Sequence, residues 1–473
     1  MIPLRLNAEG QPLVNTPERP TYLPGVLVIK VKPGVVQEVP DLAGKTVAAA
    51  RSLRLPEAVE EPIAMLRRKG LIEQVVPVFA SAPLAMVSAP KLKAHSATAA
   101  AATMAVSEQA LLDIRIPAVA FTRSVREVGD KDLQGINLLR LSARADLPAL
   151  QKELDKARGV EYCHRVPARW PARTSVAAGL ANPMLNRQWG LRAIHWFEAQ
   201  PLPDASEVKV AVLDTGVDAK HPDLQRVIAA YHSDGTTDTD IVGHGTHVSG
   251  ILGANPDDRA GITGASNCKI HLWKVFKDVP YDGEYYADEV LYERALGAVL
   301  DSGMRVVNLS LTGTVRNPTE EMLFRKLIDS NVVVVAAMGN DFQKGNPTGY
   351  PAAYPSVIAV GATDETDKRA SFSNTGSHIS LSAPGTNILS TLPSYTSAYR
   401  PEQKDYIAWN GTSMATPQVT AAAASVVARN PRFSNRDVTD RLTNTAIKVP
   451  AMRGRKNTQE LGAGLLDLRS ALQ

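Results

Sequence analysis

Three side chains that can act together in nucleophilic catalysis occur far apart in the sequence, in the order Asp214, His244 and Ser413. A serine hydroxyl is a poor nucleophile until a neighbouring base takes its proton, and a third group must orient that base. Histidine and aspartate are the residue types that supply these two functions. The chemistry to consider is therefore acyl transfer through a serine nucleophile, if the fold brings the three residues together.

Ser413 precedes a long run of small and apolar residues that ends at Arg429. Such a run predicts a buried helix. Because proline is tolerated only near a helix start, Pro417 indicates that the helix begins close to Ser413. The serine hydroxyl would then lie near unpaired backbone N–H groups, after a sharp turn at Gly411. An ordinary N-cap serine is the alternative interpretation of this stretch taken alone.

Asp214 and His244 occur in two further stretches that favour a catalytic site. Asp214 ends a valine-rich run over 208–213 and is followed by Thr-Gly. This pattern predicts a buried parallel strand with the aspartate at its carboxyl end, where open α/β sheets bind ligands. His244 lies among small residues at the expected start of a helix, and we interpret His247, one turn further on, as a structural histidine.

Four motifs resemble those of the subtilisin family (subtilases) of serine endopeptidases. They are Asp-Thr-Gly at 214–216, His-Gly-Thr-His at 244–247, Val-Ala-Ala-Met-Gly-Asn at 335–340 and Gly-Thr-Ser-Met-Ala at 411–415. Their order is also that of subtilisin. The resemblance runs from about residue 188 to the C-terminus and implies an α/β fold, a subtilisin-like parallel sheet with helices on both faces.

The hydrophobic pattern after residue 188 agrees with this fold, because strands alternate with helices. Strands are expected at 208–213, 270–275, 306–310, 332–337 and 357–360, and helices at 244–253, 288–301, 320–330, 413–429 and 434–445.

The resemblance implies a role for each catalytic residue. Ser413 would be the nucleophile, His244 the general base and then the general acid, and Asp214 the group that orients the histidine. The Ser413 backbone N–H and the Asn340 side-chain amide would stabilise the oxyanion.

Substrate is expected to bind as an extended strand beside Ser310, Leu311 and Thr312. The first specificity pocket would lie between that segment and Gly339, with Gly349 at its base. Thr312 stands where the family usually has glycine, which would narrow the cleft.

Calcium is bound by many members of the family, although the chemistry needs no metal. Asp223 matches a position that often ligates calcium, and Asp257 and Asp258 fall in the loop that would complete such a site. Solvated loop carboxylates are the alternative interpretation.

Composition limits the partners and the compartment. The net charge is only +4 over 473 residues, which gives no reason to expect a nucleic-acid partner. No apolar run reaches membrane-spanning length, so no membrane association is expected. Cys163 and Cys268 fall in different predicted domains, which favours free buried thiols. The N-terminus lacks a signal-peptide pattern, so a cytoplasmic location, non-classical export and a missing N-terminus all stay open.

The first part of the chain predicts a separate, smaller α+β domain. Residues 1–21 are an expected loose arm, and residues 22–166 hold two strand–helix–strand units that resemble a subtilase propeptide. A low-complexity insertion is expected at about 80–130, and residues 167–187 are a linker and candidate processing region before the catalytic domain at 188–473. An unrelated regulatory domain is the alternative for residues 22–166.

The leading hypothesis is a serine endopeptidase that cleaves internal bonds of proteins or peptides through an acyl-enzyme. It would be made as a self-inhibited zymogen, with its own N-terminal domain as the inhibitor. A peptide macrocyclase or transpeptidase that uses the same triad is one alternative, and a non-catalytic, protease-derived binding module is another.

Overall fold

A computed structural model describes residues 5–6, 12–13, 22–31, 71–78, 136–142, 145–157, 159–171, 185–233, 238–255, 261–281 and 283–473. The chain divides into two compact units. The larger unit comprises Met1–Leu23, Pro167–His232 and Asp238–Gln473, and the smaller comprises Pro24–Val166 and Ser233–Thr237.

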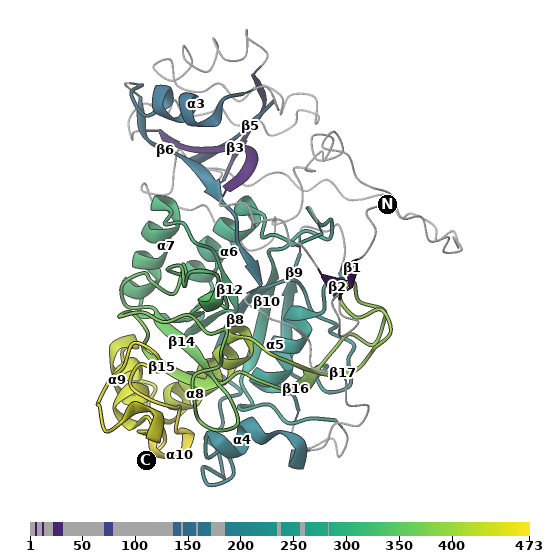
Figure 1. The fold of residues 1–473 in the computed structure, drawn as a ribbon, viewed down its shortest axis with the longest axis vertical. Helices are drawn as coiled ribbons and strands as arrows, with labels where there is room; N and C mark the ends of the chain where they lie inside the picture. Colours follow the sequence, from purple (N-terminus) through teal and green to yellow (C-terminus); the bar gives the residue numbers. More distant parts are fainter. Residues whose placement is uncertain are drawn as a thin grey trace. The chain divides into compact units, whose positions relative to one another are not determined.

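The larger unit is built on a seven-stranded sheet with the order β15-β14-β13-β11-β8-β10-β9 (Figure 1). Every neighbouring pair in it is parallel. The strands are β8 (Lys209–Asp214), β9 (Ile228–His232), β10 (Lys269–Lys274), β11 (Val306–Leu309), β13 (Val333–Ala337), β14 (Ile358–Thr363) and β15 (Leu381–Pro384). The predicted α/β class and parallel sheet are confirmed, and β9 and β15 extend the sheet at its two edges.

Helices cover both faces of the sheet, as predicted. They are α4 (Trp189–Ala193), α5 (His244–Gly253), α6 (Glu289–Asp301), α7 (Pro318–Asp329), α8 (Thr412–Arg429), α9 (Asn435–Thr445) and α10 (Leu468–Ala471). Helices α5 and α8 pack on each other and on the strands, while α6 and α7 form a second pair. Since successive strand residues point to opposite faces, the apolar runs of these strands fit a sheet that is buried on both sides.

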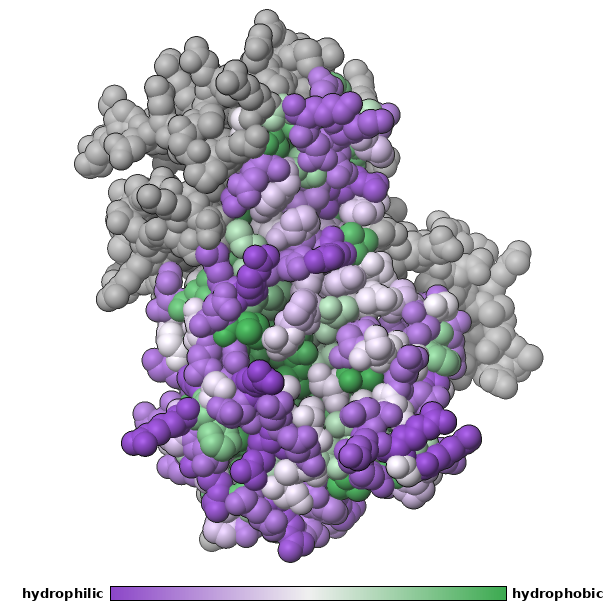
Figure 2. Space-filling model, turned by 90° about the vertical axis from the view of Figure 1, so that its left-hand side faces the viewer, coloured by the Kyte–Doolittle hydropathy of each residue, from purple (hydrophilic) through white to green (hydrophobic). Residues whose placement is uncertain are grey.

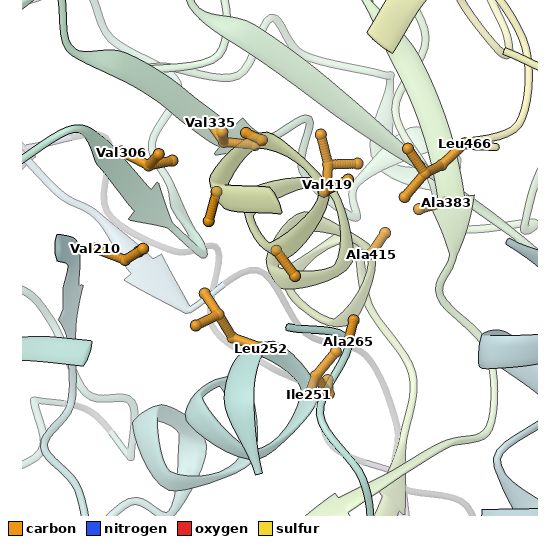
Figure 3. Close-up of a cluster of buried hydrophobic side chains, with 14 of the residues drawn as sticks. Val210, Ile251, Leu252, Ala265, Val306, Val335, Ala383, Ala415, Val419 and Leu466 are labelled. Carbon is orange, nitrogen blue, oxygen red and sulfur yellow. The ribbon is translucent and has the colours of Figure 1, made fainter. Parts of the chain in front are cut away.

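The core between the sheet and the α5–α8 pair is continuous. Alternate residues of β8 and β11, such as Val210 and Val306, meet Leu252 of α5 and Ala415 and Val419 of α8 (Figure 3). All five side chains are fully buried. The small side chains of α8 allow the helix to lie close to the sheet, which holds the start of α8 at the edge where the strands end.

Two short antiparallel ladders complete the larger unit near this edge. One joins β16 (Ile388–Thr391) to β17 (Tyr406–Trp409), and the other joins β7 (Trp170–Pro171) to β12 (Leu311–Thr312). In the expected N-terminal arm, β1 (Arg5–Leu6) pairs with β2 (Pro12–Leu13). Strand β7 lies in the expected linker, so part of that linker is an ordered strand.

The smaller unit contains a four-stranded sheet with the order β4-β5-β3-β6 and one described helix. Its elements are β3 (Tyr22–Val31), β4 (Ile72–Pro77), β5 (Ile136–Leu141), α3 (Leu147–Leu154) and β6 (Val160–Pro167). Leu150 and Leu154 of α3 pack on Leu27, Ile29 and Leu139 of the sheet. These elements fit the predicted strand–helix–strand units, whereas the helix of the first unit and the insertion at about 80–130 lie outside the described residues.

Among the described residues, the large hydrophobic side chains that are exposed are Phe197 and Val279. On the face drawn in Figure 2, hydrophilic residues predominate and hydrophobic residues form small separate patches. None of the helices in the described ranges combines the length and apolarity that crossing a membrane requires. Cys163 and Cys268 are free and buried, as predicted, and burial raises the pKa of the Cys268 thiol to about 12.

Candidate active site

Asp214 and His244 meet at the carboxyl edge of the sheet. Asp214 is the last residue of β8 and His244 the first of α5, and their Oδ1 and Nδ1 atoms are 2.7 Å apart. Asp214 also accepts the backbone N–H of Thr215 at 2.7 Å. The other ring nitrogen of His244, Nε2, is buried and has no hydrogen-bond partner among the described residues. An imidazole held at Nδ1 in this way presents Nε2 as a proton acceptor.

Close approach between α5 and β8 requires a residue without a side chain. A Cβ atom at Gly245 would lie 2.1 Å from the carbonyl oxygen of Gly216 and 3.1 Å from the Cβ of Asp214. Any other residue would push the start of the helix away from the strand. Gly245 therefore allows His244 to reach Asp214.

A buried carboxylate that the sequence analysis did not single out joins these two segments. Oδ1 of Asp240 accepts the Thr215 hydroxyl and the Gly243 N–H, both at 2.8 Å. Its Oδ2 accepts the N–H and the hydroxyl of Thr246 at 2.8 and 2.7 Å. Asp240 thus links Thr215, the residue after Asp214, to Gly243 and Thr246 at the start of α5. Its loop contains several aspartates, and no spacing signal marks this one.

Ser413 is the second residue of α8 and is fully buried. Its hydroxyl donates to the carbonyl oxygen of Ser310 at 2.8 Å, and the Ser310 hydroxyl donates to the Ser413 carbonyl at 3.0 Å. This reciprocal pair fixes the helix start beside the end of β11. In this structure the Ser413 hydroxyl is therefore directed at Ser310, and it must rotate to reach Nε2 of His244.

Helix α8 begins at Thr412, close to Ser413 as predicted, and Pro417 lies inside the helix. Proline has no N–H, so the carbonyl four residues earlier, that of Ser413, loses its helical hydrogen bond. The Ser310 hydroxyl takes the place of that donor. The Ser310 hydroxyl, which bonds to the carbonyl that Pro417 leaves free, thus couples the helix to the end of β11.

Asn340 directs one end of its side chain at the start of α8. Its Oδ1 accepts the backbone N–H and the hydroxyl of Thr412 at 2.9 and 3.0 Å. The Nδ2 atom is buried and has no partner among the described residues. Because Oδ1 is fixed, Nδ2 is a preorganised donor next to Ser413.

Of the residues predicted to bind substrate, Leu311 and Thr312 form β12, while Gly339 and Gly349 lie in the segment between β13 and β14. The Thr312 hydroxyl would be 2.9 Å from a Cβ atom at Gly349 and 3.5 Å from one at Gly339. The Thr312 hydroxyl therefore lies close to both glycines. A Cβ at Gly349 would also lie 2.5 Å from the carbonyl oxygen of Met338, so the close packing of these segments requires glycine at this position.

Strand β7 occupies the edge at which substrate is predicted to bind. Pro171 pairs with Leu311 and Trp170 with Thr312, antiparallel. On the other side, the carbonyl of Arg169 accepts the N–H of Ala287 at 3.1 Å. The chain's own segment 168–171 is therefore hydrogen-bonded on both sides, as a central strand would be.

His247 has a different environment from His244. Its ring stacks on Trp409 with centroids 4.7 Å apart, and Nε2 lies 3.1 Å from the carbonyl oxygen of Ile407. Burial lowers the pKa of His247 to about 3, and the nearby His244 adds to this effect. The side chain therefore stays neutral at ordinary pH, in keeping with the structural role predicted for it.

The predicted calcium ligands are only partly described. Asp223 is fully buried, and its Oδ2 accepts the N–H of Ile262 at 2.9 Å. Asp257 and Asp258 lie outside the described residues. Within the described ranges no group of three or more acidic, histidine or cysteine side chains is arranged to hold a metal ion. Asp223 alone does not fit calcium, which takes six to eight oxygen ligands.

The comparisons with known proteins agree with this fold. The model of the subtilase family (peptidase S8) matches residues 205–465, and the chain belongs to this family of serine endopeptidases. It is 37% identical over 273 residues to Subtilisin E of Bacillus subtilis (strain 168), a match that covers 57% of this chain and 66% of the relative, just under two thirds.

Two further similarities extend this finding. The Subtilisin of Bacillus pumilus is 37% identical over 273 residues, which cover 57% of this chain and 92% of that protein. Among solved structures, fervidolysin from Fervidobacterium pennivorans, a keratinolytic enzyme related to subtilisin, has 28% identity and a TM-score of 0.59. That similarity covers 72% of this chain and 56% of the other.

The depressed pKa of His247 predicts a pH-dependent stability. The unfolded histidine binds a proton below about pH 6.5, while the folded one does so only near pH 3. The unfolded state therefore binds more protons in this window, and the free energy of unfolding falls as the pH decreases from about 6.5 towards 3. At pH 5 the loss from this group is about 2 kcal/mol.

Denaturant unfolding of Ser413→Ala at pH 7 and pH 5, with and without His247→Gln, measures this contribution. The serine variant is used to prevent self-digestion. We expect the glutamine variant to lose about 2 kcal/mol less between the two pH values. An unchanged difference would contradict the assignment.

Proposed function

We propose that this chain hydrolyses internal peptide bonds through an acyl-enzyme on Ser413, with His244 as the base and Asp214 as its orienting group. The observation that carries the proposal is the 2.7 Å contact between His244 and Asp214, which leaves the other ring nitrogen of His244 without a described partner. A base prepared in this way at the start of α5, beside a serine at the start of α8, suits acyl transfer.

The reaction begins when the Ser413 hydroxyl exchanges its bond to Ser310 for one to Nε2 of His244. As the oxygen attacks the substrate carbonyl, its proton passes to Nε2 and the imidazolium is stabilised by Asp214. Collapse of the tetrahedral intermediate breaks the peptide bond, and His244 protonates the leaving amine. Water, activated by the same histidine, then hydrolyses the ester and releases Ser413.

The oxyanion of the intermediate requires donors that are in place before the reaction. The Nδ2 of Asn340, which has no partner within the described part of the chain, is one such donor, and the backbone N–H of Ser413 near the helix start is the other. Their fixed positions favour the transition state, because no reorganisation accompanies the development of charge.

We further propose that the chain is made as a self-inhibited zymogen. The antiparallel pairing of β7 with β12 supports this, since a peptide substrate would use the same edge. A covalently tethered segment has an effective concentration of roughly millimolar, so even weak affinity keeps the edge occupied. Cleavage of the linker would turn the tethered inhibitor into one that can dissociate.

The macrocyclase and binding-module hypotheses differ from hydrolysis in measurable ways. A fluorophosphonate probe labels Ser413 in an enzyme but not in a non-catalytic module. Mass spectrometry of the peptide products distinguishes linear fragments, formed with water, from cyclic or transpeptidated ones.

Ser413→Ala is expected to abolish casein hydrolysis and fluorophosphonate labelling. In subtilisin itself, loss of the nucleophile lowers kcat by about 10⁶. Because only a hydroxyl is removed, the melting temperature should stay close to that of the parent. Casein cleavage at the parent rate would contradict the assignment.

Asn340→Ala is expected to lower kcat by about 10²–10³ with little change in KM, because the donor acts on the developing oxyanion. The magnitude is that of the corresponding change in subtilisin. Thr412→Val is the matched control, since it removes the hydroxyl contact to Asn340 and keeps the amide. Equal kcat for Asn340→Ala and the parent would exclude Asn340 as a donor.

The register of β7 also predicts where the chain is cut. Pro171, the last described residue of this segment, pairs with Leu311, which follows Ser310, and the carbonyl of Ser310 accepts the Ser413 hydroxyl. We therefore predict cleavage after Ala172, a residue outside the described ranges, and a new N-terminus at Arg173.

N-terminal sequencing of the purified parent and of Ser413→Ala tests this. The new N-terminus should be found in the parent and not in the variant. A parent that stays full-length and fully active would exclude self-inhibition, and the same cut in both proteins would indicate another protease.

A further inference from the structure

The side chain of Arg169 is enclosed in an acidic pocket of the larger unit. It is 1% exposed. Its Nε and Nη2 donate to the two oxygens of Glu320 at 3.1 and 2.8 Å, and Nη1 donates to Glu289 at 2.7 Å. The guanidinium lies over the ring of Tyr292, 5.2 Å from its centroid. We call the site formed by Glu289, Glu320 and Tyr292 the acidic pocket.

The acidic pocket is preorganised by groups other than Arg169. Each oxygen of Glu320 also accepts a phenol hydroxyl, from Tyr292 and from Tyr354, both at 2.7 Å. Glu289 accepts the side-chain amide of Asn317 at 2.5 Å. Asn317 itself caps α7 through the N–H groups of Thr319 and Glu320. The carboxylates are thus held in position by α6, α7 and their flanks.

The charges of the acidic pocket require a cation. Burial opposes the charge of Arg169, but Glu289 and Glu320 outweigh it and raise the pKa of the guanidinium well above its usual range. Burial raises the pKa of Glu289 to about 7 although Arg169 opposes this. Burial and the neighbouring Glu289 also raise the pKa of Glu293 well above its usual range. Without a guanidinium, Glu320 and Glu289 would be uncompensated buried acids.

The acidic pocket opens onto the predicted substrate edge. Arg169 is the residue before β7, and its carbonyl bonds to Ala287 while the next residues pair with β12. A Cβ atom at Gly313 would lie 3.1 Å from Cγ of Arg169 and 2.7 Å from the carbonyl oxygen of Ala168. Because Gly313 has no side chain, the aliphatic part of an arginine can pass beside it and reach the carboxylates.

We propose that the acidic pocket is a specificity subsite that selects an arginine side chain of the substrate at the position that Arg169 occupies. This inference rests on the proposed function. In the register given above, the position is the fourth residue before the bond that is cut. When segment 168–171 leaves, a substrate arginine replaces Arg169 and restores the charge balance of the two carboxylates.

The geometry favours arginine over lysine. The two parallel bonds to Glu320 and the third to Glu289 use three nitrogens of a planar guanidinium. A lysine ammonium is a single point donor and cannot form the same fork. The alternative is that the ion pair only fastens segment 168–171 and that the enzyme is indifferent to this substrate position.

Peptide cleavage by the self-processed enzyme tests the proposal. Internally quenched peptides carry arginine, citrulline, lysine or leucine at the fourth position before the cut, with all other positions constant. Citrulline is a neutral isostere of arginine, so this pair isolates the charge. We expect kcat/KM for arginine to exceed that for citrulline and for leucine by about tenfold or more.

Two substitutions assign the effect to the acidic pocket. Glu320→Gln and Glu289→Gln keep the shape of the side chain and should each reduce the arginine preference at least severalfold. Glu321→Gln is the matched control, because Glu321 follows Glu320 on α7 but pairs with the exposed Arg316. The concentration of active enzyme is measured by fluorophosphonate labelling, so that misfolded protein does not lower the kcat/KM of a variant. The comparison of arginine with citrulline peptides uses the parent enzyme and needs no variant.

The possible outcomes distinguish a failure of the arginine subsite from a failure of the proposed endopeptidase function. A preference for arginine that is lost in the pocket variants and kept in Glu321→Gln supports the inference. Equal cleavage of arginine, citrulline and leucine peptides by labelled enzyme overturns it and leaves the proposed function intact. A preference unchanged in both pocket variants also overturns it. No labelling and no cleavage of any peptide overturns the proposed function and this inference together.

Discussion

A parallel sheet places the carboxyl ends of all its strands at one edge, and the candidate site depends on this constraint. Asp214 ends β8, Ser310 follows β11 and Asn340 follows β13. Helices α5 and α8 begin at the same edge, so His244 and Ser413 are brought to the strand ends by the packing of two helices on one sheet face. Residues separated by as many as two hundred positions in the chain, roughly, become neighbours for this single geometric reason.

Hydrogen bonding then determines which atoms stay reactive. Buried polar groups are normally paired, because an unpaired one loses its hydration without compensation. Asp240 satisfies four donors between β8 and α5, and Thr412 satisfies Oδ1 of Asn340. Among the buried atoms left without a described partner are Nε2 of His244 and Nδ2 of Asn340. In the proposed mechanism, Nε2 of His244 accepts the proton of Ser413 and Nδ2 of Asn340 donates a hydrogen bond to the oxyanion.

Most of the larger unit could be predicted from the sequence, because valine-rich strands and small-residue helices carry strong periodic signals. The edge strands β9 and β15 could not, since each is short and β15 ends in proline. The acidic pocket also escaped prediction. Glutamates in the first turn of a helix usually interact with the helix dipole at the surface, and nothing local distinguishes Glu289 and Glu320 from such residues.

The burial of Arg169 affects the rate at which segment 168–171 dissociates as well as the affinity with which it is bound. To leave the acidic pocket, the Arg169 guanidinium must break its three hydrogen bonds to Glu289 and Glu320 before water can form hydrogen bonds in their place. Differences between related complexes reside mainly in the rate of dissociation. A cut chain that keeps Arg169 in place would therefore stay bound for longer than its two-residue ladder with β12 suggests. If the chain processes itself as proposed, the delay between cleavage and release of the β12 edge would then depend on this one side chain.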